Sequence, residues 1–379
     1  MTHTFAAPDL SPGALALVTA EIASTAADYD RTGEFPVKGV EAAHRAGLLT
    51  ATVGKRYGGP GLGARDAARI LTAIGEGDAS VGLLAANLLN THSAQAVHSS
   101  WPAAAYDDLL RRSQEGPALA NAIRAEPELG APARGGLPKT TLTPYGKGFV
   151  LNGRKAYATG GRGLAYHVVW AVEGERVGHV IVPGDAEGIT WIDTWDHLGL
   201  RASNTHDVVY ENVHVPADAF AEIPRGPDGV YRDPAAAASA GSFGHPALYI
   251  GVARAARTAF AEFARNRVPA SLGRPIAETE RIQAVAGEID LQIEQAETLL
   301  HGALLRVEAG EKPNLSAVKV AIARSVIAAT QTAVAALGNP GLSRHLPLER
   351  HLRDALCIRV HPPQEDAVVL ASGRRVLFP

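Results

Sequence analysis

Cysteine is almost absent from this chain. Cys357 is the single cysteine among 379 residues, which excludes a disulfide framework within one chain and any multi-cysteine zinc or iron–sulfur site. A chain without disulfides fits a reducing compartment, so we expect a cytoplasmic protein. Its 46% hydrophobic residues are enough to bury cores without such cross-links.

Long hydrophobic runs and an excess of one charge are also lacking. Every apolar stretch is broken by charge or glycine well before the ~18 residues that a membrane span needs, and residues 1–11 lack the basic start and apolar core of an export signal. The 36 basic and 39 acidic residues are mixed along the sequence and give a net charge of −3. We therefore expect no membrane association and no nucleic-acid partner, because phosphate-backbone binding needs concentrated positive charge.

The motifs of several large enzyme classes are missing too. The sequence has no His-Glu-x-x-His, no Gly-x-Ser-x-Gly and no Gly-x4-Gly-Lys-Ser/Thr, which excludes common metalloproteases, serine hydrolases and P-loop proteins. His92 and His98 are spaced so that they do not share one helical face, and no metal site is expected. For His92, a polar helix surface is favoured over a place in a substrate pocket.

Three sequence patterns follow one another along the chain. Alanine- and leucine-rich segments at helical spacing come first, then short β-branched runs separated by Gly, Pro, Asn and Asp, then long helical segments again. The first helices are expected at 15–29, 37–46, 64–75 and 81–97, the strands at 139–143, 149–151, 167–172, 179–182, 190–194 and 207–215, and the last helices at 247–265, 276–309, 314–337 and 348–360.

These three sequence patterns predict an α+β fold of three domains. We expect an N-terminal helical domain at 1–118, a middle β-barrel domain at 119–225 and a C-terminal four-helix bundle at 226–379.

One segment of the middle region is specific enough to suggest a ligand site. Residues 149–161 read as a strand, a tight Asn152-Gly153 turn, a second strand and two glycines. Tyr157 and Thr159 are two apart, so on a strand they share one face, where they could pack on and hydrogen-bond a flat ligand. From the pattern alone, an ordinary hairpin with surface glycines is the favoured alternative.

Several motifs in order resemble the acyl-CoA dehydrogenase family over nearly the whole chain. The similar segments are Gly47-Leu-Leu with Tyr57-Gly-Gly-Pro-Gly61, Ala122-Ile-Arg-Ala-Glu-Pro127, Asn152-Gly-Arg-Lys to Thr159-Gly-Gly161, Trp195-Asp-His-Leu-Gly-Leu-Arg201 with 208–216, and Leu337-Gly-Asn-Pro-Gly341 with Leu348 to Arg353-Asp-Ala355.

The resemblance implies a flavin between the β region and the bundle, in a homotetramer or homodimer. Tyr157, Thr159, Ala125 and Trp195 then stand at flavin-contacting places. Arg267 matches the bundle arginine that reaches flavin phosphate, where a fork of donors suits an anion.

The departures from the family pattern concern both catalysis and cofactor binding. The dehydrogenases use a glutamate as base, and its place here is Pro362. The alternative place of that base on the first bundle helix, near Gly244, is not acidic either. The serine and glutamine that help to hold the cofactor are replaced by Ala131 and, near the second place, Ala335. The expected cofactor is therefore a flavin, either FMN or FAD.

The end of the last motif is similar to another branch of the same fold, the two-component flavin monooxygenases of the dibenzothiophene monooxygenase type. That branch lacks the glutamate and often has a histidine where His361 stands. A histidine near flavin can pass a proton, since its pKa lies near working pH. Alternatively, His361 merely ends a helix, with Pro362 and Pro363 stopping it.

We thus predict a flavin-dependent oxidoreductase, with three hypotheses for its chemistry. The first is a monooxygenase that uses reduced flavin (FMNH2 or FADH2) and O2 on a small organic substrate, with His361 catalytic and a separate flavin reductase as partner. The second is an acyl-CoA or acyl-carrier dehydrogenase whose base is Glu365 or Asp366. The third is a non-catalytic flavin-binding relative.

Overall fold

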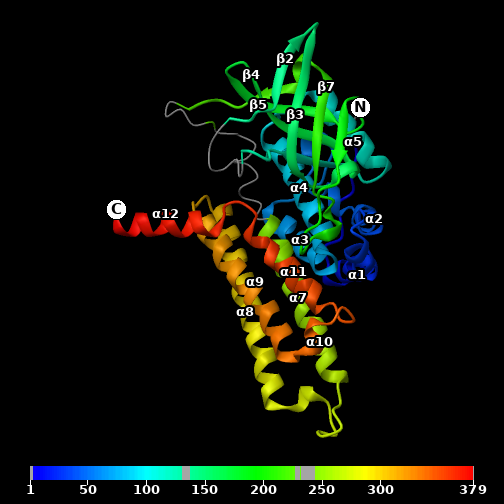
Figure 1. Ribbon diagram of the computed structural model, residues 1–379, viewed down its shortest axis with the longest axis vertical. Coiled ribbons are helices and arrows are strands. Elements are labelled where there is room, and N and C mark those ends of the chain that lie inside the picture. The colour runs from blue at the N-terminus through cyan, green and yellow to red at the C-terminus, as the bar shows by residue number, and fades with distance from the viewer. Residues whose placement is uncertain (1–2, 130–136, 227–230, 232–243, 379) are drawn as a thin grey trace.

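The chain folds into a helical region, a β region and a second helical region, in the predicted order. In this computed structural model the described residues are 3–129, 137–226, 231 and 244–378. Figure 1 shows the β region at one end of an elongated molecule and the last helices at the other, with the first helices between them on one side. The predicted fold class is confirmed.

Five α-helices form the N-terminal region. They are α1 (Pro12–Thr32), α2 (Val37–Arg45), α3 (Ala64–Gly77), α4 (Ala79–Val97) and α5 (Ala103–Glu115). Asp78 lies between α3 and α4, and its carboxylate accepts hydrogen bonds from the N–H groups of Ser80 and Val81, which caps α4. Sequence analysis did not predict α5.

The middle region is one mixed sheet of eight strands. They are β1 (Leu119–Ile123), β2 (Thr141–Tyr145), β3 (Gly148–Ala158), β4 (Leu164–Glu173), β5 (Arg176–Pro183), β6 (Ile189–Ile192), β7 (His206–Pro216) and β8 (Phe220–Glu222). The strand order is β6-β7-β3-β2-β4-β5-β8, and β1 pairs with β4 in parallel. The long strand β3 lies between β7 and β2 in this order.

The predicted tight turn at Asn152-Gly153 is wrong. β3 runs through both residues without a turn, and the β2–β3 hairpin instead closes at Gly146, whose φ is +59°. Gly153 lies at a register shift against β7, and a Cβ there would be 2.6 Å from Oγ1 of Thr140. The lack of a side chain at Gly153 therefore permits a β-bulge and the close approach of Thr140, two situations in which glycine is common.

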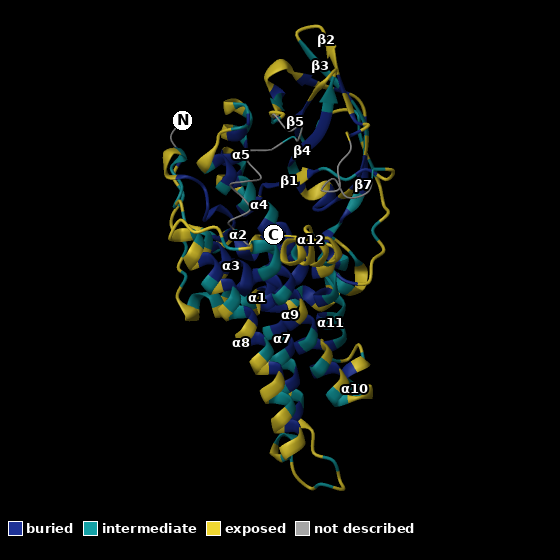
Figure 2. Ribbon diagram, turned by 90° about the vertical axis from the view of Figure 1, so that its left-hand side faces the viewer, coloured by how far each residue is buried: buried dark blue, intermediate teal, exposed yellow. Residues whose placement is uncertain are grey.

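The C-terminal region is a bundle with one projecting helix. Its helices are α7 (Gly244–Asn266), α8 (Glu280–Glu308), α9 (Leu315–Leu337), α10 (Asn339–Leu342), α11 (Leu348–Leu356) and α12 (Glu365–Leu377), with a 3₁₀ turn at Cys357–Arg359 after α11. α7, α8, α9 and α11 pack together. Figures 1 and 2 show α12 extending away from the body as a largely exposed helix.

Two glycines bring the two helical regions into close contact. A Cβ on Gly75 of α3 would lie 2.2 Å from the carbonyl oxygen of Leu248, and one on Gly251 of α7 would lie 2.1 Å from that of Thr72. The Thr72 hydroxyl also donates to the carbonyl of Ala247 at 3.1 Å. The helices touch along their backbones, which fixes the first turns of α7 in place.

α9 is a core helix of this bundle. Among the described residues it is the one helix long and apolar enough to cross a membrane, and 56% of its most apolar stretch is buried inside the protein. A buried core helix passes the same test of length and composition as a membrane span.

Candidate functional site

The end of β3 presents an aromatic side chain from a strained backbone. Tyr157 is 59% exposed and has φ of +57°, a left-handed conformation that is unusual for a residue with a bulky side chain. Thr159 is only 8% exposed, so the two side chains do not share one open face as alternation predicted. The left-handed turn at Tyr157 breaks the alternation.

The Thr159 hydroxyl stands in a short hydrogen-bonded chain. It accepts from the hydroxyl of Thr205 at 3.1 Å, which in turn contacts the hydroxyl of Ser203 at 2.7 Å. With its oxygen serving as acceptor, the Thr159 O–H remains available to donate to a ligand. Asn121 donates to the Thr159 carbonyl at 2.9 Å and holds the backbone.

The two glycines after Thr159 are packed against protein. Gly160 and Gly161 are buried, with φ of +104° and +49°. A Cβ on Gly160 would lie 2.5 Å from the Leu164 side chain, and one on Gly161 would lie 2.9 Å from the Asn204 carbonyl oxygen. These glycines are therefore not the surface residues of the ordinary-hairpin alternative.

Ala125 lies beside β3 on a segment held by a buried ion pair. Its carbonyl accepts from the N–H of Ala156 at 2.9 Å. The next residue, Glu126, accepts from Nζ of Lys155 at 2.8 Å and from the hydroxyl of Thr140 at 2.7 Å. Burial alone raises the pKa of Glu126, but these donors outweigh it and lower the pKa overall. The ion pair therefore fixes Ala125 against the strand that carries Tyr157.

Trp195 lies on a loop that packs against α11. Its indole N–H donates to the carbonyl of Leu200 at 2.9 Å, and the N–H of Leu200 donates to the carboxylate of Asp354 at 2.7 Å. A Cβ on Gly199 would lie 2.4 Å from the Arg353 carbonyl oxygen. Burial raises the pKa of Asp354 to about 7. The tryptophan motif and the Arg-Asp-Ala motif, distant in sequence, thus meet directly.

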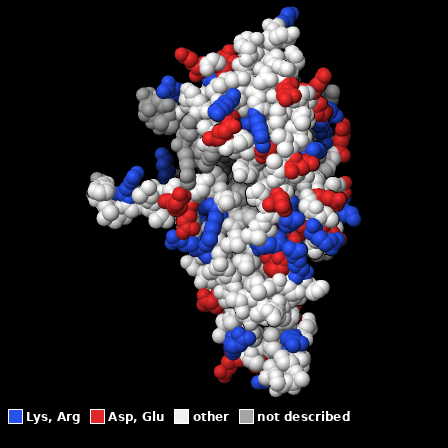
Figure 3. All heavy atoms as spheres, viewed as in Figure 1, with Lys and Arg blue, Asp and Glu red and all other residues white. Residues whose placement is uncertain are grey.

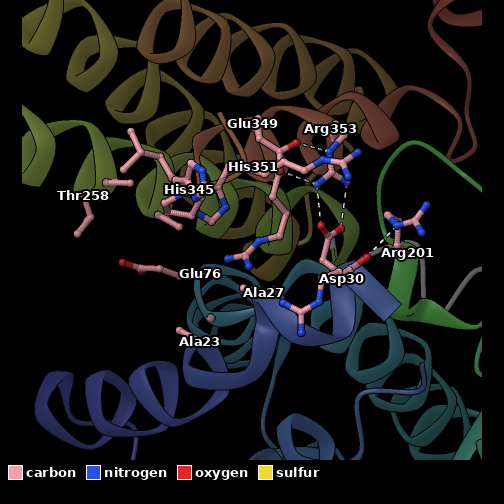
Figure 4. Close-up of a pocket in the computed structure, with 18 of the residues that line it drawn as sticks. Ala23, Ala27, Asp30, Glu76, Arg201, Thr258, His345, Glu349, His351 and Arg353 are labelled. Atoms are coloured by element: carbon pink, nitrogen blue, oxygen red, sulfur yellow. Dashed lines mark hydrogen bonds and ion pairs between the residues drawn. The ribbon is translucent and has the colours of Figure 1, made fainter. Parts of the chain in front are cut away.

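Arg353 ties the same loop to α1. Its guanidinium donates to Asp30 at 2.6 and 3.0 Å, to Glu349 at 2.6 and 3.0 Å, and to the carbonyl of Leu198 at 2.8 Å. Figure 4 shows Arg353 and Arg201 converging on Asp30 at the edge of a pocket of about 760 Å³. None of the six predicted site residues lines this pocket.

His361 lies where α7, α9 and the end of α11 meet. Its Nε2 is 2.7 Å from the hydroxyl of Tyr249, and its ring stacks on that of His245 with centroids 4.6 Å apart. Lys319 of α9 donates from Nζ to the carbonyl of His361 at 3.0 Å and to that of Pro363 at 3.2 Å. His361 is therefore one member of a polar cluster in which Tyr249 and Lys319 are buried and His245 and His361 are half-buried.

Both histidines of this cluster are neutral at physiological pH. Burial, then His245 and then Lys319 hold the pKa of His361 well below its ordinary value. Burial and the Lys319 charge lower the pKa of His245 to about 4. A neutral His361 gains nothing as a cation at a helix end, which weighs against the alternative that it merely caps the helix.

The dehydrogenase hypothesis concerns Pro362, at the place of the family's base, and Glu365, a candidate to replace that base. Pro362 is exposed. Glu365, at the start of α12, is held by Arg324 of α9 at 2.7 Å in a largely exposed ion pair. His361 precedes Pro362 and His245 follows Gly244, so each position that the family resemblance assigns to the base adjoins one histidine of the stacked pair.

Arg267 lies apart from the other predicted site residues. It is exposed and opens the loop after α7, at the end of the bundle opposite the β region (Figure 1). Ala335 lies near the end of α9, and Arg281 of α8 reaches the carbonyl of the following residue, Ala336, at 3.4 Å. Both phosphate-side positions are therefore at the far end of the bundle. Ala131 lies outside the described residues.

Several members of the site were not recognised from sequence. Tyr249, His245 and Lys319 lie on α7 and α9, more than 40 residues from His361, so only tertiary contacts bring them together. His245 and Tyr249 are one turn apart on α7, but the predicted helix began at residue 247, so this spacing gave no signal from the sequence. His92 was expected on a polar helix surface, but it is fully buried and its Nδ1 contacts the hydroxyl of Tyr106 at 3.0 Å.

The end of β3 carries side chains of types that suit a flat heteroaromatic ligand, the exposed ring of Tyr157 and the hydroxyl of Thr159, although the two do not share one open face. The half-buried indole of Trp195 is stacked on the ring of His197, with centroids 3.6 Å apart. The charged surface carries no comparable signal. Figure 3 shows basic and acidic side chains interspersed on the face displayed, without a large area of one sign.

Comparison with known proteins identifies the family. Three models of the acyl-CoA dehydrogenase family match: the N-terminal domain at 10–99, the middle domain at 122–213 and the C-terminal domain at 243–363.

Relatives of different named activity are similar to this chain. The L-evernosamine nitrososynthase of Micromonospora sp. is 34% identical over 309 residues, covering 78% of this chain and 69% of that protein. The short-chain specific acyl-CoA dehydrogenase of Megasphaera elsdenii is 25% identical over 371 residues, covering 94% of each. A structure of KijD3 in complex with FMN and dTDP-3-amino-2,3,6-trideoxy-4-keto-3-methyl-D-glucose has a TM-score of 0.81 at 26% identity, covering 100% of this chain and 96% of that chain.

These matches confirm the predicted family resemblance, and with it the prediction of a flavin cofactor at the level of the family. They include both dehydrogenases and a nitrososynthase, so the family alone leaves the reaction open. The chain belongs to the acyl-CoA dehydrogenase family, a superfamily of flavin-dependent oxidoreductases.

Proposed function

We propose that this protein is a monooxygenase that uses reduced flavin and O2 to oxidise a small organic substrate. His361 is the catalytic residue, and Tyr157, Thr159, Ala125 and Trp195 contact the flavin. When bound, reduced flavin supplies the electrons and activates O2, while the protein orients the reactants and manages protons.

The observation that carries the proposal is the lack of a carboxylate at both places of the dehydrogenase base, Pro362 and the position near Gly244, each of which adjoins one histidine of a stacked pair. Abstraction of an α-proton from a thioester needs a base within hydrogen-bond reach of that proton. A pKa of about 4 makes the His245 imidazole no stronger a base than an ordinary glutamate, and the pKa of His361 is also well below its ordinary value. Glu365 is engaged by Arg324 on the surface. A neutral imidazole held by a hydroxyl is instead suited to hydrogen-bond a reacting ligand.

The contacts of His361 define what it does. Its Nε2 and the hydroxyl of Tyr249 share one hydrogen bond, which fixes the orientation of the imidazole. The stacked ring of His245 covers one face of the imidazole. Burial raises the pKa of Tyr249 well above its ordinary value, so the hydroxyl stays protonated.

Partners follow from the same proposal. A monooxygenase of this kind receives reduced flavin from a separate flavin reductase. Arg267 is exposed at the far end of the bundle, so we propose that it contacts flavin phosphate on another copy of the chain, within a homotetramer or homodimer. With Ala335 in place of a cofactor-holding glutamine, FMN is the expected flavin, and FAD is the alternative. The cytoplasmic location also stays a prediction.

The nitrososynthase relative supports this chemistry over dehydrogenation. It is 34% identical over 78% of the chain, and its name describes an enzyme acting on the amino sugar L-evernosamine. An amino-sugar nucleotide is therefore the first substrate class to assay.

The test is rapid mixing of the protein, loaded anaerobically with reduced FMN or FAD, with O2-saturated buffer. The proposal expects a transient absorbance that precedes oxidised flavin and lasts longer than with free flavin. His361→Gln should shorten its lifetime at least about tenfold, which corresponds to ~1.4 kcal/mol of stabilisation. No transient in the wild type, or an unchanged lifetime in His361→Gln, would overturn it.

A control variant separates His361 from the surface of the same segment. Glu365→Gln removes the partner of Arg324 without touching the cluster, and its transient should match that of the wild type. A purified protein that is colourless and binds neither flavin by calorimetry would favour a non-catalytic relative instead.

A further inference from the structure

Lys319 is the one charged member of the cluster around His361. It is 5% exposed and lies on α9, whose other buried residues are apolar apart from Ser325 and Thr330. Taking an ammonium out of water costs several kcal/mol unless it is well paired. Among the described residues, its Nζ donates hydrogen bonds to the carbonyls of His361 and Pro363.

The two carbonyls belong to the turn that presents His361. This turn has no helical hydrogen bonds of its own, because it lies between the 3₁₀ turn at Cys357–Arg359 and the start of α12 at Glu365. A lysine near a helix end can satisfy free carbonyls as an ordinary cap. Here the capped residue is itself bonded to Tyr249 and stacked on His245, so the cap also sets the position of an imidazole.

We propose that Lys319 is a positioning residue for the proposed reaction: its buried ammonium fixes the turn from His361 to Pro363 and thereby holds the imidazole against the hydroxyl of Tyr249. Lys319 does not touch flavin or substrate in this assignment. It acts through His361 alone, and the inference rests on the proposed function of that histidine.

The charge of Lys319 supplies a second, measurable effect. It contributes to the lowered pKa values of both His361 and His245. The groups that face His361 are His245 and Tyr249 from α7 and Lys319 from α9. Glu365 faces Lys319 from the start of α12, and Asp354 and Cys357 face Tyr249 from the end of α11. Removing the ammonium should therefore raise the pKa of His361 toward its ordinary value.

The experiment compares three variants in the full-length protein. Lys319→Met removes both the donors and the charge. Lys319→Gln removes the charge and keeps N–H donors for the two carbonyls. Arg324→Met is the matched control, since Arg324 lies on the same helix and binds the same chain segment through an exposed ion pair with Glu365.

The first readout is histidine NMR, which needs no turnover. The ring signals of His361 and His245 are assigned by their loss in His361→Gln and His245→Gln, and their pKa values are followed by titration. We expect both Lys319 variants to raise the pKa of His361, and Arg324→Met to leave it unchanged.

The second readout is the lifetime of the transient after reduced flavin meets O2. Lys319→Met should shorten the lifetime of the transient about as much as His361→Gln does. Lys319→Gln should shorten this lifetime less than Lys319→Met. An unshifted His361 pKa in a folded Lys319 variant, or an equal loss in Arg324→Met, overturns the assignment. If Lys319→Met does not fold, Lys319→Gln decides on both readouts.

The two proposals fail in different ways. A wild type without any transient contradicts the monooxygenase, while a raised His361 pKa in the Lys319 variants would still support the positioning of the imidazole. A wild-type transient that is unchanged in the Lys319 variants contradicts the positioning role alone.

Discussion

The buried ion pair of Lys155 and Glu126 allows a quantitative prediction. The two side chains are 0% and 3% exposed, with 2.8 Å between Nζ and the carboxylate. Replacing Lys155 by Met leaves the Glu126 carboxylate buried without its counter-charge. Breaking such a pair typically costs about 3 to 5 kcal/mol of unfolding free energy.

The remaining partners of Glu126 place the expected cost at the lower end of that range. The backbone N–H groups of Lys139 and Thr140 and the hydroxyl of Thr140 still donate to the carboxylate, at 2.7, 3.0 and 2.7 Å. We therefore expect Lys155→Met to destabilise the protein by about 3 kcal/mol. Flavin affinity should fall as well, because Glu126 adjoins Ala125 at the proposed cofactor site.

The assay is urea unfolding followed by circular dichroism and tryptophan fluorescence. Trp170 is a local probe, because Nζ of Lys155 lies 5.8 Å from the centroid of its ring. Lys139→Met is the matched control: Lys139 pairs with Glu128 at 3.3 Å, and both side chains are largely exposed. This control should cost less than about 1 kcal/mol.

Acid pH gives an independent check on the same pair. The pKa of Glu126 is lowered in the folded state, so its contribution to stability is present above its unfolded value of 4.5 and is lost as pH falls through the lowered value. Lys155→Met should remove much of this dependence. A cost below about 1 kcal/mol together with an unchanged acid limb would refute the reasoning.

Two further variants test other features of the fold. Gly153→Ala should cost about 2 kcal/mol, because the new Cβ would meet Oγ1 of Thr140 at 2.6 Å, and a fully stable variant in urea unfolding would contradict the bulge account. Asp354→Asn keeps the acceptor and removes a carboxylate whose pKa is raised to about 7, against an unfolded value of 3.8. Since the folded wild type binds more protons than the unfolded chain between these values, its stability should fall as pH rises through that window. The Asn variant should show a flatter profile, and identical profiles in unfolding measurements at pH 4 to 8 would exclude this role for Asp354.

Much of the fold could be predicted because its helices have strong periodic patterns. The expected segments 37–46 and 314–337 correspond closely to α2 and α9, whose apolar residues pack into the core. α12 was missed because an exposed helix needs no apolar stripe, and Val368 is its one buried residue among those described. The turn at Gly153 was mispredicted because Asn-Gly signals both a hairpin and a bulge.

The candidate site could be predicted only in part. His361 and Trp195 were found through motifs that run along the chain. Their partners were not, because Tyr249 reaches His361 and Asp354 reaches Leu200 only after α7 and α11 have packed. Neutralisation of the histidines was also hidden, since it depends on burial and on Lys319 from a third helix.

The most direct test of the central claim is anaerobic mixing of the oxidised, flavin-loaded protein with an acyl-CoA thioester such as butyryl-CoA, monitored by flavin absorbance. A dehydrogenase transfers hydride to its flavin under these conditions and bleaches it, which requires a base near the α-proton. Because Pro362 stands at one place of that base, the place near Gly244 is not acidic, and Glu365 is paired with Arg324, we predict that the absorbance will not change. Rapid bleaching that is lost in Glu365→Gln or Asp366→Asn would contradict the account and establish the dehydrogenase.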